Sequence, residues 1–198
     1  MKNKNLRELA LDSLLKIENE EAYSHLVVNY MIKQGKLHEK DIGLFTEIVY
    51  GTVQRKNTLD FILSRFLPKK IKKKDEWILT LLRMSVYQME YLERIPDRAI
   101  LFEAVQIAKK RGHRGLANLV NGILRNVQRS GPPLFNEIHD EVERVAVEYS
   151  HPIWLVSRWV QHYGLEIAQN ICKANLERPI VTARVNTMKT TVSEVLKL

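Results

Sequence analysis

The most regular feature of the sequence is an apolar stripe between residues 116 and 127 that repeats with the period of an α-helix. Its members lie one, three or four positions apart and are Leu116, Leu119, Val120, Ile123, Leu124 and Val127. This spacing gathers them on one helix face, which must be buried. Earlier segments with the same period cover residues 4–18, 24–32, 39–53, 59–67, 75–89 and 97–112. The sequence therefore predicts an all-α first part built from seven helices.

Breaks between these helices suggest how they are arranged. Residues 69–74 read Lys-Lys-Ile-Lys-Lys-Lys, a self-repelling run that is typical of an exposed connector and divides the bundle into two helical halves. Gly51 lies inside the third helix at a cost of about 1 kcal/mol relative to alanine, so we expect a close helix crossing there. Arg83 falls outside the apolar stripe of the fifth helix and is expected to emerge on another side. The residues Gly131, Pro132 and Pro133 end the seventh helix.

Beyond this stop the pattern changes to short helices and one strand. Helices are predicted near residues 141–149, 153–164 and 166–175, and Ser150-His151-Pro152 is expected to cap the second of them. Residues 180–186 alternate in the manner of a strand, and Thr191-Val192-Ser193-Glu194 is a capping box that starts another helix. We therefore divide the chain into a domain at 1–131, a short helical linker region at 132–179 and a third segment at 180–198.

The strand at 180–186 has no partner elsewhere in the sequence. A lone strand leaves its backbone N–H and C=O groups unpaired, and it does not stay ordered without a ladder. Its partners are therefore expected beyond Leu198, and the chain is interpreted as a piece of a longer protein whose next domain begins with a sheet.

Charge is unevenly distributed along the chain, whose net charge is +8. Residues 1–131 contain 24 Lys and Arg against 15 Asp and Glu, a net charge of +9. The remainder contains 7 against 8, a net charge of −1. A positive excess confined to one folded unit favours a polyanionic partner such as nucleic acid, although lysine-rich surfaces are also common without one.

Other functional classes find little support in the sequence. The single cysteine, Cys172, excludes an internal disulfide, and its apolar helical neighbours indicate a structural role. The six histidines lack metal-ligand spacing, so we predict no metal. Trp154 and Trp159 are expected in a core or a domain interface, and His151 at a helix start. No secretory signal or membrane span is evident, so we expect a cytoplasmic protein with no membrane partner.

Three motifs in the first 131 residues resemble the NusB fold. They are Asp41-x-x-Leu44-x-x-Glu47-x-Val49-x-Gly51, then Leu81-Leu82-Arg83-x-x-x-Tyr87-Gln88, and then Glu103-Ala104-Val105 with Asn121-Gly122-Ile123-Leu124-Arg125. NusB-type domains are all-helical RNA-binding domains built from two halves. The resemblance therefore implies a NusB-like helical bundle that binds RNA.

Motifs in the remainder resemble the RsmB (Sun/Fmu) family of ribosomal RNA methyltransferases. They are Tyr149-Ser150-His151-Pro152-x-Trp154-Leu155-Val156-x-Arg158-Trp159, Tyr163-Gly164, Ala174-Asn175 through Pro179, and Arg184-Val185-Asn186-Thr187. This resemblance implies an enzyme that uses S-adenosylmethionine to methylate carbon 5 of a cytosine in small-subunit (16S) ribosomal RNA. Residues 180–198 would then begin the methyltransferase domain.

The chain departs from that family in lacking the reactive parts. The chemistry needs one cysteine thiolate to attack the base, a second cysteine to assist release, and a Rossmann-like pocket for the cofactor. The sequence contains neither this pair of cysteines nor the pattern of such a pocket. We therefore predict no catalytic, cofactor-binding or metal-binding residue, no cofactor in this chain itself, and no activity of the chain alone.

Two groups of basic residues are the predicted RNA contacts. Lys109, Lys110, Arg111 and Arg114 surround Gly112 where one helix ends and the next begins, and backbone amides can also meet phosphate there. The second group follows from the resemblance, since NusB-like domains tend to place basic residues near the amino terminus, and it contains Lys2, Lys4 and Arg7. Asn121 and Arg125 match the motif but could equally cap or pack the last helix.

Two other functions remain open at this point. A stand-alone NusB-like antitermination factor would bind RNA without catalysis, but it should end near Arg129, whereas this chain continues with Trp154, Trp159 and the strand. A helical protein-interaction module would carry a basic face that is merely solvated.

Overall fold

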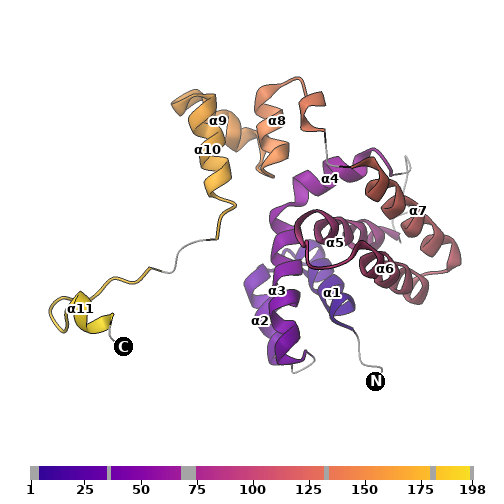
Figure 1. Cartoon of the computed structure of the whole chain (residues 1–198), viewed down its shortest axis with the longest axis horizontal. Coiled ribbons are helices and arrows are strands. Elements are labelled where there is room, and N and C mark those ends of the chain that lie inside the picture. The colour runs from indigo at the N-terminus through magenta and orange to yellow at the C-terminus, as the bar shows by residue number, and fades with distance from the viewer. Residues whose placement is uncertain (1–4, 35–36, 68–74, 132–133, 179–181, 197–198) are drawn as a thin grey trace.

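The regular elements of the chain are helical in the computed structural model, which describes all residues except 1–4, 35–36, 68–74, 132–133, 179–181 and 197–198 (Figure 1). The first part contains α1 (Leu6–Asn19), α2 (Ser24–Lys33), α3 (Glu39–Gln54), α4 (Lys56–Ser64), α5 (Trp77–Tyr91), α6 (Asp97–Arg111) and α7 (Arg114–Ser130). The second contains α8 (Glu141–Glu148), α9 (Ile153–Tyr163), α10 (Leu165–Ala174) and α11 (Val192–Val195). The predicted all-α class is confirmed. The connector predicted at 69–74 lies outside the described residues.

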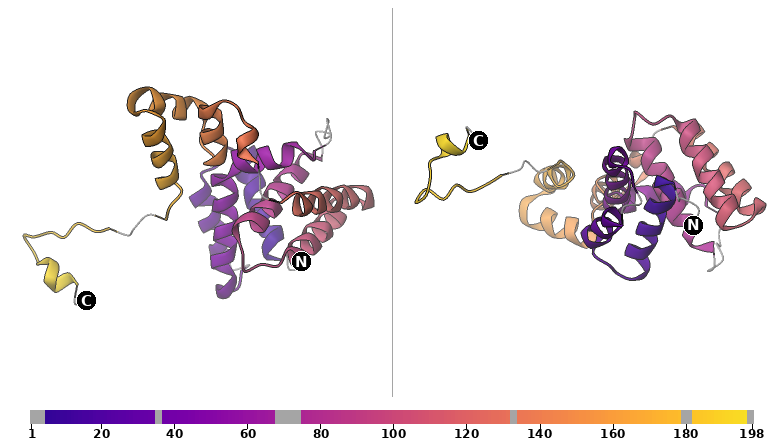
Figure 2. Two further views of the ribbon diagram at one scale, coloured as in Figure 1. Left: turned by 45° about the horizontal axis from the view of Figure 1, so that its top comes forward. Right: turned by 90° about the horizontal axis from the view of Figure 1, so that it is seen from below.

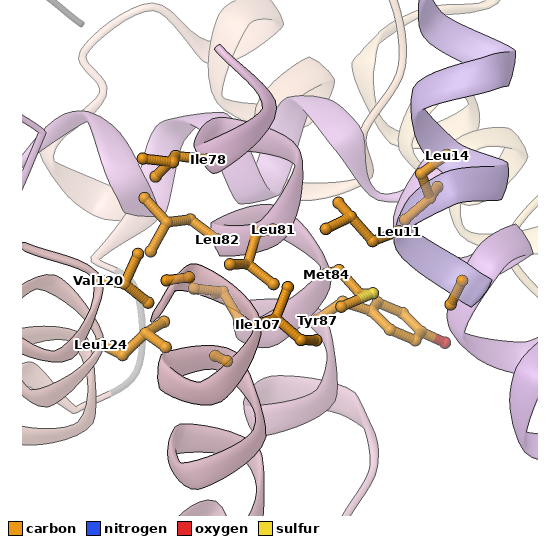
Figure 3. Packing of buried hydrophobic residues seen from close by; sticks show 14 of the residues in the cluster. Leu11, Leu14, Ile78, Leu81, Leu82, Met84, Tyr87, Ile107, Val120 and Leu124 are labelled. Carbon is orange, nitrogen blue, oxygen red and sulfur yellow. The ribbon is translucent and has the colours of Figure 1, made fainter. Parts of the chain in front are cut away.

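Helix α5 lies at the centre of the first part. Ten of its fifteen residues are buried, so it has neighbours on every side, and it contacts α1, α3, α4, α6 and α7. Figure 3 shows the apolar side chains that surround it, among them Leu11, Leu14, Ile107, Val120 and Leu124. Each fully buried side chain of this kind contributes about 1.5–3 kcal/mol. Burial of α5 is therefore the main source of cohesion between the helices on either side.

The close crossing predicted at Gly51 is confirmed. A Cβ atom at this position of α3 would overlap the ring of Tyr87 on α5. The Tyr87 hydroxyl donates a hydrogen bond of 2.7 Å to the Glu47 carboxylate, one turn earlier on α3. Burial, with the neighbouring Glu47 carboxylate, raises the pKa of Tyr87. Glycine at 51 therefore provides the space in which this ring lies.

The position of Arg83 outside the apolar stripe suggested that it emerges into solvent. In the structure, however, Arg83 is buried and only 9% exposed. Its guanidinium donates to both carboxylate oxygens of Asp60 on α4, at 2.5 and 3.0 Å. It also donates to Glu18 on α1 at 2.7 Å, and the Thr80 hydroxyl donates to the same carboxylate at 2.6 Å. The periodicity prediction fails here because the arginine is buried together with two carboxylates contributed by other helices.

Helices α8, α9 and α10 form a second, smaller core against the side of α4. The buried residues of this core are Val145, Ala146, Val156 and Cys172. Cys172 is fully buried, and burial raises the pKa of its thiol, in agreement with the predicted structural role. Trp159 packs against this core, whereas Trp154 is 67% exposed and belongs to neither core of the described chain.

Hydrogen bonds to the main chain join the second core to α4. The Thr58 hydroxyl donates to the Val147 carbonyl at 2.6 Å, and the Asn57 side chain donates to the His151 carbonyl at 3.1 Å. Ser150 was predicted to cap α9, but it does not do so. Its hydroxyl instead accepts from the Asn57 backbone N–H at 3.0 Å, and Pro152 occupies the N-cap position. The predicted cap is wrong because the serine is used to hold the two cores together.

The strand predicted at 180–186 is not formed in its described part. Residues 182–186 have no regular secondary structure and are mostly exposed, while 180 and 181 lie outside the described residues. The physical reason is that no other described segment provides a neighbouring strand with which its backbone N–H and C=O groups could form hydrogen bonds. Residues 182–196 extend away from the helices (Figures 1 and 2). The predicted capping box is present, with Thr191 and Glu194 bonded reciprocally at the start of α11.

We predict that replacing Gly51 with alanine destabilises the protein, whereas the same change at Gly43 does not. Both glycines lie in α3, and alanine is favoured in a helix by about 1 kcal/mol. A Cβ at Gly43 meets nothing within 4 Å, but at Gly51 it collides with Tyr87. Gly51→Ala should lower the free energy of urea unfolding by about 1–3 kcal/mol through overpacking. Equal effects at the two positions would contradict the close crossing.

Candidate nucleic-acid interface

The predicted RNA contacts fall on α1 and on the turn between α6 and α7. Lys2 and Lys4 lie outside the described residues. Arg7 is in the first turn of α1, Lys109 to Arg111 form the last turn of α6, and Arg114 is the first residue of α7. Side-chain contacts join α1 to α6 and so bring the two groups to one side of the molecule. One of these contacts is the hydrogen bond that Asn5, the N-cap residue of α1, donates to Glu103 of α6.

Arg7 is engaged inside the protein rather than extended into solvent. Its Nε donates a hydrogen bond of 2.8 Å to the Gln88 side chain on α5. Burial lowers the pKa of the guanidinium, and the Glu103 carboxylate acts in the opposite direction. Arg7 therefore contributes positive charge near the α1 end while part of its bonding capacity is used to attach α1 to α5.

Lys110 and Arg111 form ion pairs with α1. The Lys110 ammonium lies 2.6 Å from an oxygen of Glu8, whose side chain is almost completely buried. Arg111 pairs with Asp12 one turn further along α1 and also approaches the Glu8 carbonyl at 3.4 Å. A buried carboxylate needs such a partner, because an unpaired charge away from water is costly. The two cations thus fix α6 against α1, and their charge is partly compensated.

Lys109 and Arg114 are exposed and make no ion pair with any residue that the structure describes. They lie on either side of Gly112 and His113, in the turn where α6 gives way to α7. The His113 side chain caps α7 by accepting from the Gly115 N–H at 3.1 Å. Of the five predicted contacts that are described, these two have charge that is free to meet a phosphate.

A groove between α6 and α7 extends the basic surface beyond the predicted residues. Its lining includes Arg98, Phe102, Asn121 and Arg125. Sequence reasoning singled out Asn121 and Arg125 only as motif positions and did not select Arg98 or Phe102. The available signal was the spacing of Arg98, Phe102 and Lys109 along one face of α6, at steps of four and seven residues.

Other kinds of site are not evident in the described part of the chain. It contains no group of three His, Cys, Asp or Glu side chains arranged to hold a metal ion. Among the same residues, no helix is both long and apolar enough to cross a membrane.

Fold and surface together define a helical bundle with basic residues on α1, α6 and α7 and a smaller helical unit that packs against α4. Comparison with protein families gives the class a name: the NusB family matches residues 4–129, and the chain belongs to this family. A second family, described as the ferredoxin-like domain of the RsmF/B-like methyltransferases, matches residues 151–198. That match includes α9 and α10 as well as the segment after 180.

Two curated relatives match the chain over nearly its full length. A probable ribosomal RNA small subunit methyltransferase B from Bacillus subtilis (strain 168) is 50% identical over 198 residues, which is 99% of this chain and 44% of the relative. A protein of the same description from Synechocystis sp. is 30% identical over 96% of this chain and 42% of the relative. The chain therefore spans less than half the length of these relatives.

Solved structures agree on the fold. A complex of the antitermination factors NusB and NusE with double-stranded RNA contains a chain that matches 63% of this one with a TM-score of 0.56 and 16% identity. The crystal structure of PH0851 matches 98% of this chain, and 44% of its own, with a TM-score of 0.68 and 17% identity. The NusB-like architecture predicted for the first part is confirmed.

We predict different consequences for two adjacent lysines of α6. Lys110→Ala removes the partner of the buried Glu8 carboxylate and should lower the free energy of unfolding by about 1 kcal/mol, since Lys110 is half-exposed and the pair is partly screened. Lys109→Ala should change it by less than about 0.5 kcal/mol. Both variants lose one positive charge near the end of α6. The difference between their free energies of urea unfolding therefore measures the contribution of the Lys110–Glu8 ion pair. A loss at Lys109 as large as that at Lys110 would contradict this assignment.

Proposed function

We propose that this chain is the N-terminal, RNA-binding part of an S-adenosylmethionine-dependent methyltransferase that modifies carbon 5 of a cytosine in small-subunit (16S) ribosomal RNA. The observation that carries the proposal is the 50% identity to a probable ribosomal RNA small subunit methyltransferase B along 99% of the chain. The order of the two family matches, NusB at 4–129 and RsmF/B-like at 151–198, supports the same reading.

RNA binding is assigned to the first part of the chain. Its support is the exposed, uncompensated charge of Lys109 and Arg114 beside the groove that contains Arg98 and Arg125. Cations of this kind neutralise phosphates and release condensed counterions, which favours association with a nucleic acid. We propose small-subunit ribosomal RNA as the partner and the cytoplasm as the place of action.

The methyl-transfer chemistry is assigned to a domain outside this chain. The described residues do not fit S-adenosylmethionine, since they include no strand at whose end the cofactor could lie. Cys172 does not fit the nucleophile, because it is fully buried and burial raises the pKa of its thiol, which disfavours the thiolate. No catalytic step is therefore attributed to these residues.

The stand-alone antitermination factor is less well supported. Residues after 131 are not a loose extension: α8 contacts α4, and Thr58 binds the Val147 carbonyl across the interface. Arg178, beyond α10, pairs with Glu47 of α3 at 2.7 Å. A second folded unit attached in this way, and matched by a methyltransferase family, favours the enzyme over the single-domain factor.

The double variant Lys109→Ala/Arg114→Ala should weaken binding to a small-subunit ribosomal RNA fragment and reduce its salt dependence. Removing two phosphate contacts should lower the slope of log K against log salt concentration by about 1 to 2. Arg158→Ala/Lys173→Ala is the matched control, because it removes the same charge from exposed positions on α9 and α10. Titrations at several salt concentrations measure the slope. If both double variants change it equally, the binding surface is not at the α6–α7 turn.

The chain alone should transfer no methyl group. We expect no radiolabel to move from S-adenosylmethionine to small-subunit ribosomal RNA in its presence, and no heat of cofactor binding in calorimetry. Specific labelling of a cytosine by this chain would overturn the assignment of the chemistry to another domain while leaving RNA binding intact.

A further inference from the structure

The surface between α6 and α7 contains an aromatic side chain that the fold does not use. Phe102 is 61% exposed, although its neighbour Leu101 is buried and belongs to the core. It lies in a groove of about 480 Å³ whose lining also includes Arg98, Val105, Asn121, Arg125 and Gln128. Single exposed apolar residues are common on protein surfaces, but an aromatic ring that lies in a groove beside cationic side chains is available to a ligand.

Positive charge lines the groove on both helices. Arg98 lies one turn before Phe102 on α6, and Arg125 projects from α7, where its Nε donates to Asn121 at 3.2 Å. Lys109 continues the same face of α6 toward the turn, and from Arg98 to Lys109 the rise is about 16 Å. The lining residues include no carboxylate, and Gln128, which is one of them, donates a hydrogen bond of 3.0 Å to Asp97 at the start of α6. The combined character is cationic with one aromatic face.

We infer that the α6–α7 groove holds an unpaired stretch of RNA, with one base stacked on the ring of Phe102 and the flanking phosphates next to Arg98 and Arg125. This inference rests on the proposed function and names the form of RNA that the basic surface selects. Bases in a duplex stack on one another and leave no face for an aromatic side chain, whereas unpaired bases stack readily on such platforms. Guanidinium groups on both sides supply the complementary charge.

Replacing Phe102 tests the inference with little risk to folding, because the side chain is largely exposed. The probes are a fluorescein-labelled, unstructured RNA oligonucleotide of mixed sequence and the duplex formed by annealing it to its complement. Phe102→Ala should weaken binding of the single strand by about fivefold or more, the loss of one base stack, and leave duplex binding within about twofold. Phe102→Trp, which keeps an aromatic face, should restore single-strand binding, and Phe102→Leu should not.

Tyr163→Ala is the matched control. Tyr163 is also an exposed aromatic residue, at 56%, but it lies on α9 away from the groove. It should bind both probes like the unmodified chain. Thermal melting followed by circular dichroism verifies that each variant is folded.

The outcomes separate this inference from the proposed function. Unchanged binding of both probes by Phe102→Ala, or equal weakening of both, overturns base stacking in the groove but leaves the RNA-binding assignment in place. Duplex binding by the unmodified chain without single-strand binding also overturns only the groove. Failure of the unmodified chain to bind either probe overturns both. Selective loss of the single strand, with rescue by tryptophan, supports the inference.

Discussion

Burial of α5 on all sides is the constraint on which the rest of the first part depends. The helix carries Arg83 and Gln88 into the interior along with its apolar residues. A buried guanidinium without a partner costs several kcal/mol, so Asp60 of α4 and Glu18 of α1 must lie where the structure places them. The Gln88 side chain in turn accepts from Arg7. Polar pairing thus fixes the registers that apolar burial alone would leave loosely specified.

The same pairing determines how much of the basic surface is available for binding. Glu8 and Asp12 lie on the side of α1 that faces α6, where they pair with Lys110 and Arg111. The net positive charge of the domain is therefore not spread evenly over its predicted contacts. Among the predicted contacts that the structure describes, the exposed charge without an ion pair is that of Lys109 and Arg114, and the α6–α7 groove adds Arg98 and Arg125. Charge counting identified residues 1–131 as basic, but it could not tell which of the cations are paired.

Sequence periodicity was sufficient for the helices because each stripe is a local property. The crossing at Gly51 was also predictable, since a glycine inside a helix has a cost that close approach explains. The environments of Arg83, Lys110 and Phe102 could not be predicted, because each depends on residues far away in sequence. Arg83 pairs with Glu18 and Lys110 with Glu8, and Phe102 lies in a groove that α7 completes. The strand at 180–186 failed for the same reason, as alternation describes a strand but cannot supply its partner.

The turn between α8 and α9 shows how the two units are joined. Ser150 has a φ of 56°, in the left-handed region that non-glycine residues occupy at a cost of about 1–3 kcal/mol. That conformation brings its hydroxyl to the Asn57 N–H and the His151 carbonyl to the Asn57 side chain. The first bond satisfies a backbone N–H group at the start of α4, where such groups lack helical partners, and the second satisfies the Asn57 side-chain amide. The strain is therefore offset by capping of α4, and the orientation of α9 and α10 follows from the backbone path through this turn. Under the proposed function, this turn sets the direction in which the chain leaves the RNA-binding domain.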